Sequence, residues 1–181
     1  REDAKEATGQ KAEAPASKPV ETDEKKENAE EKNTMSETVT IRYVAPEDLD
    51  AVTMVEATCF PEAEAATRDR IEARIQTFPK NFWVAEVDGR VIGFINGMAC
   101  ERRTIVDDMF EFATMHDDKG AWQSVMSIGV LPEYQKHGIA ARLMNTLIDD
   151  ARSAGRKGCT LTCKDRLIHY YAKFGYQDEG V

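Results

Sequence analysis

The sequence predicts an α+β protein with a mixed, mostly antiparallel sheet flanked by helices, and three observations indicate this class. Short β-branched segments such as 39–44 alternate apolar and polar residues, as half-buried strands do. The segment 82–99 contains two strand-like halves joined by Asp88-Gly89, which is the turn signal of a tight hairpin. The segment 125–151 passes from an apolar strand through a turn into an amphipathic helix. A strand that leads into a helix in this way predicts one parallel pair of strands in the middle of the sheet.

Two helices are expected between the first strand and the hairpin. The first follows the segment 46–48, whose proline and two acids suit a first helical turn, and it ends at Phe60-Pro61. The second is expected over 67–77, where apolar residues share one face.

The C-terminal third predicts three more elements. A glycine-rich turn at 155–158 ends the long helix and leads into a strand over 159–163. A helix is expected over 165–174, capped by its first aspartate and followed by Gly175. A last strand is expected over 176–181.

Composition divides the chain into two parts. Residues 1–38 are rich in Glu, Lys, Ala and Pro and contain almost no large apolar residue. Such a segment cannot bury enough apolar surface to offset its ordering entropy, so we expect a disordered, charged tail or linker there. The folded domain is expected over 39–181.

Charge and cysteine usage exclude several classes of partner. The formal net charge is -9, whereas nucleic-acid binding requires a basic face. No apolar run approaches the roughly 20 residues of a membrane span. The four cysteines are scattered without a Cys-x-x-Cys pair, which favours reduced thiols in a cytoplasmic protein. We therefore expect neither nucleic acid nor membrane as a partner, and a homodimer remains open.

The turn between the apolar strand and the long helix predicts a phosphate site. The N-terminus of a helix carries unpaired N–H groups and about half a positive elementary charge. Gly138 lets the backbone approach a ligand without a Cβ, and Ala140 is similarly small. Lys136 and His137 add cationic character. The sequence contains neither of the other glycine-rich phosphate loops, so we expect a pyrophosphate at this turn.

The spacing Gln135-x-x-Gly138-x-Ala140 resembles the acyl-CoA-binding turn of the GNAT N-acetyltransferases, whose pattern is Gln/Arg-x-x-Gly-x-Gly/Ala. The resemblance covers about residues 40–181. It implies the GNAT acyl-CoA N-acyltransferase fold, in which the two parallel central strands splay apart and acetyl-CoA lies between them. It assigns the pyrophosphate to the turn, and the pantetheine arm and thioester carbonyl to the backbone of the preceding strand. The residues expected to contact acetyl-CoA are Ile128, Gly129, Val130, Gln135, Lys136, His137, Gly138, Ile139 and Ala140.

The segment 165–176 resembles the C-terminal helix of the same family, with its Tyr-x-x-x-Gly-Phe/Tyr ending. Tyr171 falls where many members carry a tyrosine that protonates the leaving CoA thiolate. A thiolate leaving group gains from a nearby O–H donor, so the resemblance implies a catalytic role for Tyr171. The alternative is that Tyr171 packs the helix, with Tyr170 on its solvent side.

Within the superfamily, Phe60-Pro61 and the segment 163–165 look most like the arylalkylamine N-acetyltransferases. The vertebrate enzymes of that group carry two histidines on the strand before the CoA turn, which relay the proton of the amine. The corresponding positions here are Ser124 and Met126, so this relay is not carried over. The family also usually adds a strand beside 159–163, after the point at which this sequence stops. We expect either an exposed sheet edge there or another segment or subunit that fills it.

The acidic segment 101–122 has two readings. It is either a solvated excursion with a short helix or a lid whose acids attract a cationic amine. The residues that the second reading and the resemblance assign to the acceptor are Phe60, Pro61, Asp107, Asp108 and Glu111.

Other reactive groups are weaker candidates. His116 is a conceivable base, whereas His169 is expected at the surface. Cys163 would be needed for a covalent acyl-enzyme, but a packing thiol is the simpler reading. No metal is implied.

The combined reading is an acetyl-CoA-dependent N-acetyltransferase. It transfers the acetyl group to a primary amine, a small arylalkylamine or a polyamine, by direct attack in a ternary complex. Two alternatives remain open from the sequence. One is a protein N-terminus or a lysine as the acceptor, and the other is a non-catalytic module that binds acetyl-CoA.

Overall fold

The computed structural model describes residues 38–180, so the predicted disordered tail lies almost wholly outside the described residues. The chain folds as an α+β protein, as predicted. Its strands and α-helices are β1 (Thr40–Tyr43), α2 (Leu49–Cys59), α3 (Arg68–Thr77), β2 (Phe82–Val87), β3 (Arg90–Asn96), β4 (Ala99–Cys100), α4 (Asp107–Glu111), β5 (Trp122–Val125), β6 (Ser127–Val130), α5 (Ile139–Ser153), β7 (Gly158–Leu161) and α6 (Ile168–Ala172).

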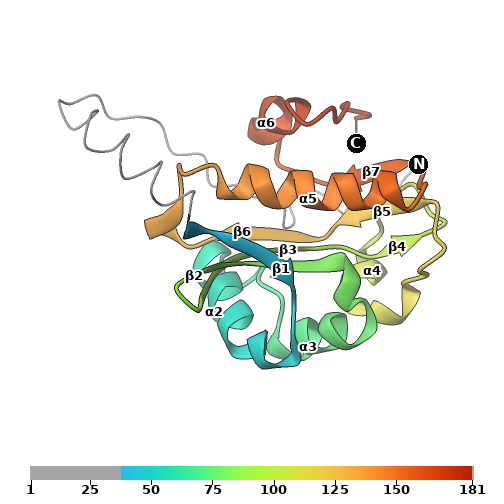
Figure 1. The fold of residues 1–181 in the computed structure, drawn as a ribbon. Helices are drawn as coiled ribbons and strands as arrows, with labels where there is room; N and C mark the ends of the chain where they lie inside the picture. Colours follow the sequence, from blue (N-terminus) through green and yellow to red (C-terminus); the bar gives the residue numbers. More distant parts are fainter. Residues whose placement is uncertain (1–37, 181) are drawn as a thin grey trace.

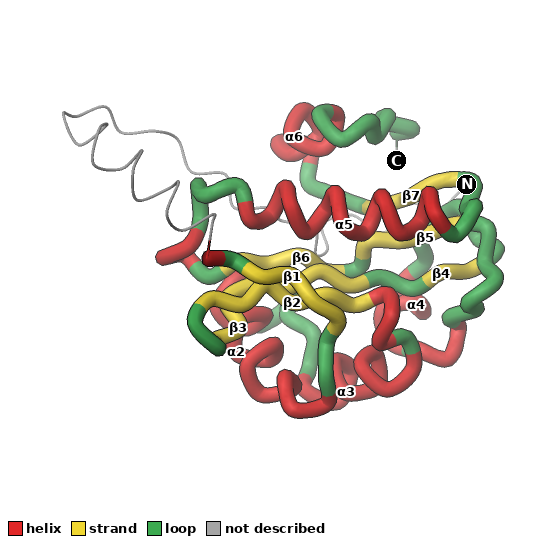
Figure 2. The backbone as a smooth tube through the Cα atoms, viewed as in Figure 1, coloured by secondary structure: helices red, strands yellow, loops and turns green. Residues whose placement is uncertain are grey.

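The strands form two sheets that meet in the middle of the molecule (Figure 1). The first is antiparallel, with the order β1-β2-β3-β6. The second has the order β4-β5-β7, in which β5 and β7 run parallel. The tube in Figure 2 shows the strands as one continuous twisted layer with α5 along one face.

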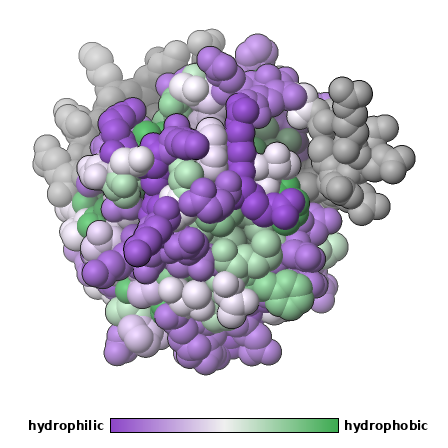
Figure 3. Space-filling model, turned by 90° about the vertical axis from the view of Figure 1, so that its right-hand side faces the viewer, coloured by the Kyte–Doolittle hydropathy of each residue, from purple (hydrophilic) through white to green (hydrophobic). Residues whose placement is uncertain are grey.

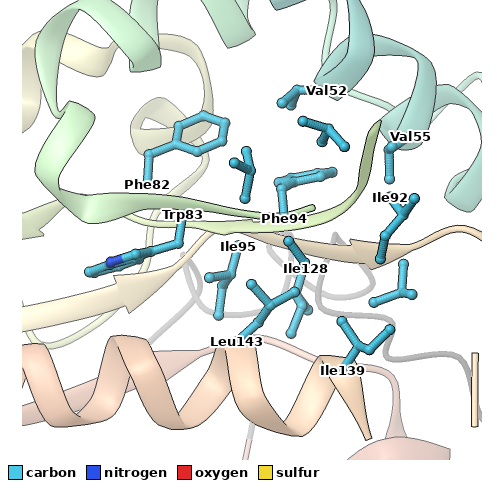
Figure 4. Packing of buried hydrophobic residues seen from close by; sticks show 14 of the residues in the cluster. Val52, Val55, Phe82, Trp83, Ile92, Phe94, Ile95, Ile128, Ile139 and Leu143 are labelled. Carbon is cyan, nitrogen blue, oxygen red and sulfur yellow. The ribbon is translucent and has the colours of Figure 1, made fainter. Parts of the chain in front are cut away.

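Helices cover both faces of the first sheet. Helix α5 packs against β2, β3 and β6 on one face, while α2 contacts β3 and β6 on the other. The close-up in Figure 4 shows Phe94 on the side of α2, with Ile95 and Ile128 pointing towards Leu143 of α5. This burial from both sides fixes the position of β6, from which the candidate site is built.

The sequence predicted one strand over 125–130, but the structure has two. Met126 interrupts them, and β5 and β6 belong to different sheets. The strand predicted over 90–99 is likewise divided into β3 and β4. A Cβ on Gly97 would lie 1.7 Å from the carbonyl oxygen of Ser124, so only glycine permits this approach of the two backbones.

The hairpin between β2 and β3 forms at the predicted residues. Asp88 and Gly89 have φ of 49° and 79°, as a type I′ turn requires. The register shifts between Ala85 and Glu86, which marks a bulge on β3.

The predicted last strand over 176–181 is wrong for the described residues. Residues 176–180 are irregular. The Gly180 N–H donates to the side chain of Asp178 and not to a neighbouring strand. An ion pair between Glu179 and Arg103 holds this tail. Asp178, Glu179 and Gly180 have low strand propensity, which explains why the free edge of β7 does not order this segment.

The helix predicted over 165–174 is shorter and starts differently. Residues 165–167 form a 3₁₀ turn whose N-cap is Lys164, and no side chain caps it. Helix α6 ends at Ala172, and Gly175 follows with φ of 94°, the left-handed conformation expected of it.

Candidate functional site

The α5 turn (residues 131–138) leaves the start of α5 open. Gly138 is the N-cap of α5 with φ of 75°, and no side chain caps the helix there. Lys136 has φ of 67°. Gly138 is exposed, and a Cβ on it would meet nothing within 4 Å. A helix of 15 residues therefore presents its N-terminal end to open space at this turn.

The side chains of the turn have separate roles. Gln135 Nε2 donates to the carbonyl oxygen of Val130 at 3.1 Å, so this side chain closes the turn onto β6. Ile139 is buried in the core, which leaves only its backbone available to a ligand. Lys136 is exposed, whereas His137 and Ala140 are half-buried.

Strand β6 presents alternate backbone groups to β3 and to its open edge. The Leu131 N–H donates to the Ile92 carbonyl at 2.8 Å, and hydrogen-bonded pairs alternate along an antiparallel ladder. The backbone of Gly129 therefore pairs with β3. The backbone groups of Ile128 and Val130 point away from β3, to the side on which β6 has no strand neighbour within its sheet.

Two side chains hydrogen-bond to the carbonyl oxygen of Val130 at this edge. Besides Gln135, the Cys59 thiol lies 3.3 Å from it. Gly129 faces Cys59 as well, because a Cβ there would lie 3.1 Å from the sulfur. Gly129 thus allows α2 to pack closely on β6, and the N–H groups of Ile128 and Val130 face the open edge.

Strands β5 and β7 separate just before β6 begins. They pair in parallel from Trp122 with Gly158 to Val125 with Leu161. Beyond that point β6 pairs with β3, while the chain after β7 continues without pairing to β6. This geometry is the splay that the sequence predicted.

Tyr171 lies on α6 and is buried, with 1% of its surface exposed. Its ring makes edge contacts with Tyr170 at 5.1 Å and with Tyr176 at 6.2 Å. Tyr170 is half-buried beside it. Tyr171 therefore faces inward, and both readings of its role are compatible with this placement.

A groove of about 830 Å³ runs along the free edge of β7. Tyr171, Trp122 and the tail 176–180 line it together with residues of β7, but no residue from 127–140 does. It therefore lies apart from the α5 turn. Figure 3 shows the end of the molecule at which α5 meets β7, where hydrophilic residues surround smaller hydrophobic areas.

The residues predicted for the acceptor are only partly brought together. Phe60 is buried and Pro61 is exposed at the start of the α2–α3 loop (residues 60–67). Asp107 and Asp108 are exposed in the first turn of α4. Glu111 pairs with Arg70 of α3 at 3.0 Å, so its charge is partly compensated.

A family model described as "Acetyltransferase (GNAT) family" matches residues 49–176. The chain belongs to this family. The match includes α2, the whole α5 turn and Tyr171.

Two curated proteins of Bacillus subtilis (strain 168) are related to this GNAT chain. One, named "Probable hydrolase YhcX", is 26% identical over 142 residues, which are 74% of this chain and 27% of that protein. The other, named "Uncharacterized N-acetyltransferase YkwB", is 28% identical over 124 residues, which are 62% of this chain and 55% of that protein. The chain thus spans about a quarter and about half of these relatives.

Solved structures share the GNAT fold. Ard1 from Thermoplasma volcanium has a TM-score of 0.62 at 22% identity, over 79% of this chain and 85% of that chain. A GNAT family acetyltransferase from Brucella melitensis in complex with acetyl-CoA has a TM-score of 0.54 at 22% identity, over 77% of this chain and 83% of that chain.

His116 makes two hydrogen bonds in this GNAT domain. His116 Nδ1 accepts the Ala99 N–H at 3.0 Å, and its Nε2 lies 2.6 Å from Asp118. The Nδ1 contact ties the segment 113–118 to β4, and the Nε2 contact lies within that segment. His169 is exposed, as expected.

The thiols near the site are poor nucleophiles. Burial, together with the charge of Glu56, raises the pKa of Cys59 to about 11. Burial also raises the pKa of Cys163, which lies just after β7 and is half-buried. Both groups are therefore protonated near neutral pH, which disfavours a covalent acyl-cysteine.

Residues 38–180 contain no cluster of three or more His, Cys, Asp or Glu side chains that could hold a metal ion. In the same range, no helix has the length and apolar character needed to cross a bilayer.

Sequence reasoning missed a buried polar cluster between the first sheet and helices α2 and α3. Its members are Glu56, Arg74, Asn96 and Ser127, all 1% exposed or less. The available signal was the position of Glu56, which follows Val52 by four residues on the buried face of α2.

Proposed function

We propose that this GNAT domain transfers the acetyl group of acetyl-CoA to a primary amine, a small arylalkylamine or a polyamine. The observation that carries the proposal is the open, uncapped start of α5 directly after an edge strand. Helix N-termini bind phosphate through their free N–H groups and dipole. The Brucella melitensis neighbour, whose fold is the same, is described in complex with acetyl-CoA.

In this proposal the α5 turn holds the pyrophosphate through the backbone N–H groups of residues 135–140. Lys136 is exposed beside it and adds positive charge. The pantetheine arm lies along the open edge of β6, between the splayed strands. Gly129 is committed to β3, whereas the Ile128 N–H faces this open edge, and we assign it as the donor to the thioester carbonyl.

The transfer proceeds by direct attack. The lone pair of the neutral amine forms a C–N bond with the thioester carbon, and the oxyanion that develops is stabilised by the Ile128 N–H. Collapse of this intermediate breaks the C–S bond, and the thiolate takes a proton from Tyr171. The surplus proton on nitrogen leaves through water towards Asp107, Asp108 or Glu111, and Tyr171 recovers its proton from solvent.

The acids at the start of α4 support a cationic acceptor. Asp107 and Asp108 are exposed and carry no paired cation among the described ion pairs. Exposed carboxylates raise the local concentration of cations at low ionic strength. We also propose a cytoplasmic location, since the four cysteines are free thiols. The homodimer stays a prediction.

One experiment separates this proposal from its alternatives. Thiol release from acetyl-CoA is measured with arylalkylamines, polyamines, and peptides that offer a free N-terminus or a lysine. Release with small amines supports the proposal. Thiol release with peptides but not with small amines would indicate that the acceptor is a protein N-terminus or a lysine. Acetyl-CoA binding without any release identifies a non-catalytic module.

A further inference from the structure

Glu56 places a carboxylate where the rest of α2 buries apolar side chains. It is 1% exposed, while Val52 and Val55 beside it are fully buried. Burying a carboxylate is costly unless hydrogen bonds and a counter-charge compensate for the lost water. A leucine at this position would satisfy the packing of α2. The reason for a carboxylate there is therefore sought in its hydrogen bonds.

The two oxygens of Glu56 join distant parts of the chain. Oε1 accepts the N–H of Ala66 at 2.8 Å, near the end of the α2–α3 loop. Oε2 accepts the hydroxyl of Ser127 at 2.7 Å, the first residue of β6. One side chain therefore fixes the α2–α3 loop to the strand that carries the Ile128 N–H.

Arg74 extends this link to the acidic segment. It is as buried as Glu56, and its Nη2 donates to the carbonyl oxygen of Phe110 in α4 at 3.1 Å. Burial lowers the pKa of Arg74 to about 10, and the negative charge of Glu56 opposes this shift. The carboxylate thus stabilises the charged guanidinium that holds α4.

We infer that Glu56 is a positioning residue that sets the distance between the acceptor-binding elements and the acetyl group. It acts through Ala66, Ser127 and Arg74, and it does not touch the substrates itself. The α2–α3 loop, with Phe60 and Pro61, is tied to β6 by the two hydrogen bonds of this carboxylate. Its charge also favours the charged form of Arg74, which bonds to α4. The inference rests on the proposed function for the meaning of these elements, but the link itself is independent of it.

Glutamine is the informative replacement. Its amide oxygen can accept the Ala66 N–H, and its NH₂ can donate to Ser127, because a hydroxyl both donates and accepts. Glu56→Gln therefore preserves the hydrogen bonds to Ala66 and Ser127 and removes the negative charge, with its support for Arg74, and the basic carboxylate oxygen. Glu56→Leu removes the link. Asp48→Asn is the matched control, since Asp48 is a buried carboxylate that accepts the Ala45 N–H far from β6.

The test combines kinetics with hydrogen exchange on the full chain. For Glu56→Leu we expect the amine KM to rise about tenfold or more while the acetyl-CoA Kd changes less than about twofold. For Glu56→Gln we expect an amine KM within about threefold of the wild type. Exchange of the Ala66 amide should accelerate about tenfold in Glu56→Leu and not in Asp48→Asn. Ser127→Ala, which leaves the helix face intact, should give an intermediate rise in the amine KM.

Two results would overturn the inference. Loss of kcat in Glu56→Gln as severe as in Glu56→Leu would assign a proton-transfer role instead. Unchanged exchange at Ala66 in both Glu56→Leu and Ser127→Ala would show that the link does not hold the loop. If the wild-type chain releases no thiol from acetyl-CoA with any amine, the proposed function fails, and the exchange measurement still decides on the link.

Discussion

Strands β6 and β7 are both four residues long and both lead towards a helix, yet their surroundings differ. All four residues of β6 are buried, whereas all four of β7 are half-buried. Strand β6 pairs with β3 and packs between α2 and α5, but β7 pairs only with β5 and borders a groove on its other edge. The following helices have 15 and 5 residues.

This difference separates two tasks within the proposed function. The groups assigned to acetyl-CoA belong to the well-packed β6–α5 region. The proposed acid, Tyr171, belongs to the β7–α6 region, where fewer elements surround the backbone. Binding and chemistry should therefore respond to different mutations, and local opening should be easier around β7.

The largest effect is expected at the N-terminal end of α5, and its C-terminal end serves as the control. Gly138→Val places a side chain at the ligand-facing N-terminus, and acetyl-CoA affinity should fall about 100-fold or more because the N–H groups can no longer approach the pyrophosphate. Gly155→Val is the matched control, since Gly155 also has positive φ and nothing within 4 Å of a Cβ. Both variants should lose about 1–2 kcal/mol of stability from backbone strain. Calorimetric titration and thermal unfolding give the two quantities, and full affinity in Gly138→Val would remove the pyrophosphate from this turn.

A second effect tests the β7–α6 region. Tyr171→Phe should lower kcat about 100-fold, since it removes the proton donor for the thiolate, and leave the acetyl-CoA Kd unchanged. Tyr170→Phe removes a hydroxyl from the half-buried neighbour and should have little effect on either. Steady-state kinetics and calorimetry measure both. A Tyr171→Phe variant with wild-type kcat would leave Tyr171 as a packing residue only.

A smaller effect is expected from the acids of α4, which lie outside both regions. Asp107→Asn with Asp108→Asn should raise the amine KM about three- to tenfold at low salt, because the attraction of exposed charges is screened by ions. Glu111→Gln should do less, since this carboxylate is paired with Arg70. Asp149→Asn on α5 serves as the exposed control. If the double variant binds amines as the wild type does at every salt concentration, the acids have no part in acceptor binding.

The smallest effect concerns the thiol that packs on β6. The pKa of Cys59 is raised from 9.0 to about 11, so the folded chain keeps a proton that the unfolded chain releases between these values. The resulting contribution to stability is present below about pH 9 and is lost as the pH rises through about 11. Urea unfolding of the wild type and Cys59→Ala from pH 8 to 11 should therefore converge as the pH rises. Parallel curves at all pH values would show that burial does not shift this thiol.

Most of the fold could be predicted because its signals are local. The hairpin at Asp88-Gly89 follows from residues that tolerate positive φ, and α5 follows from an apolar stripe at helical spacing. The division of 125–130 into β5 and β6 could not be predicted from the strand itself. It depends on Gly97, which lies far away in sequence and lets another backbone approach Ser124.

The site divides in the same way. The open glycine at the start of α5 could be predicted because a helix terminus and a missing Cβ are properties of the local chain. The sequence could not predict that Gly129 pairs with β3. It also could not predict that the Val130 carbonyl accepts from Gln135 and Cys59. These assignments depend on which neighbour each backbone group faces. The last predicted strand was wrong because the open edge of β7 does not by itself order residues 176–180.

The sequence by itself determined the α+β class, the positions of its hairpin and long helix, and membership of a family that its turn spacing already resembled. Only the tertiary structure decided which edge of β6 is open, and that Glu56 joins β6 to the α2–α3 loop. The physical reason is that helix and turn preferences act over a few residues. Hydrogen bonds between strands, and those of a buried carboxylate, depend instead on partners brought together from 10 to 71 residues away.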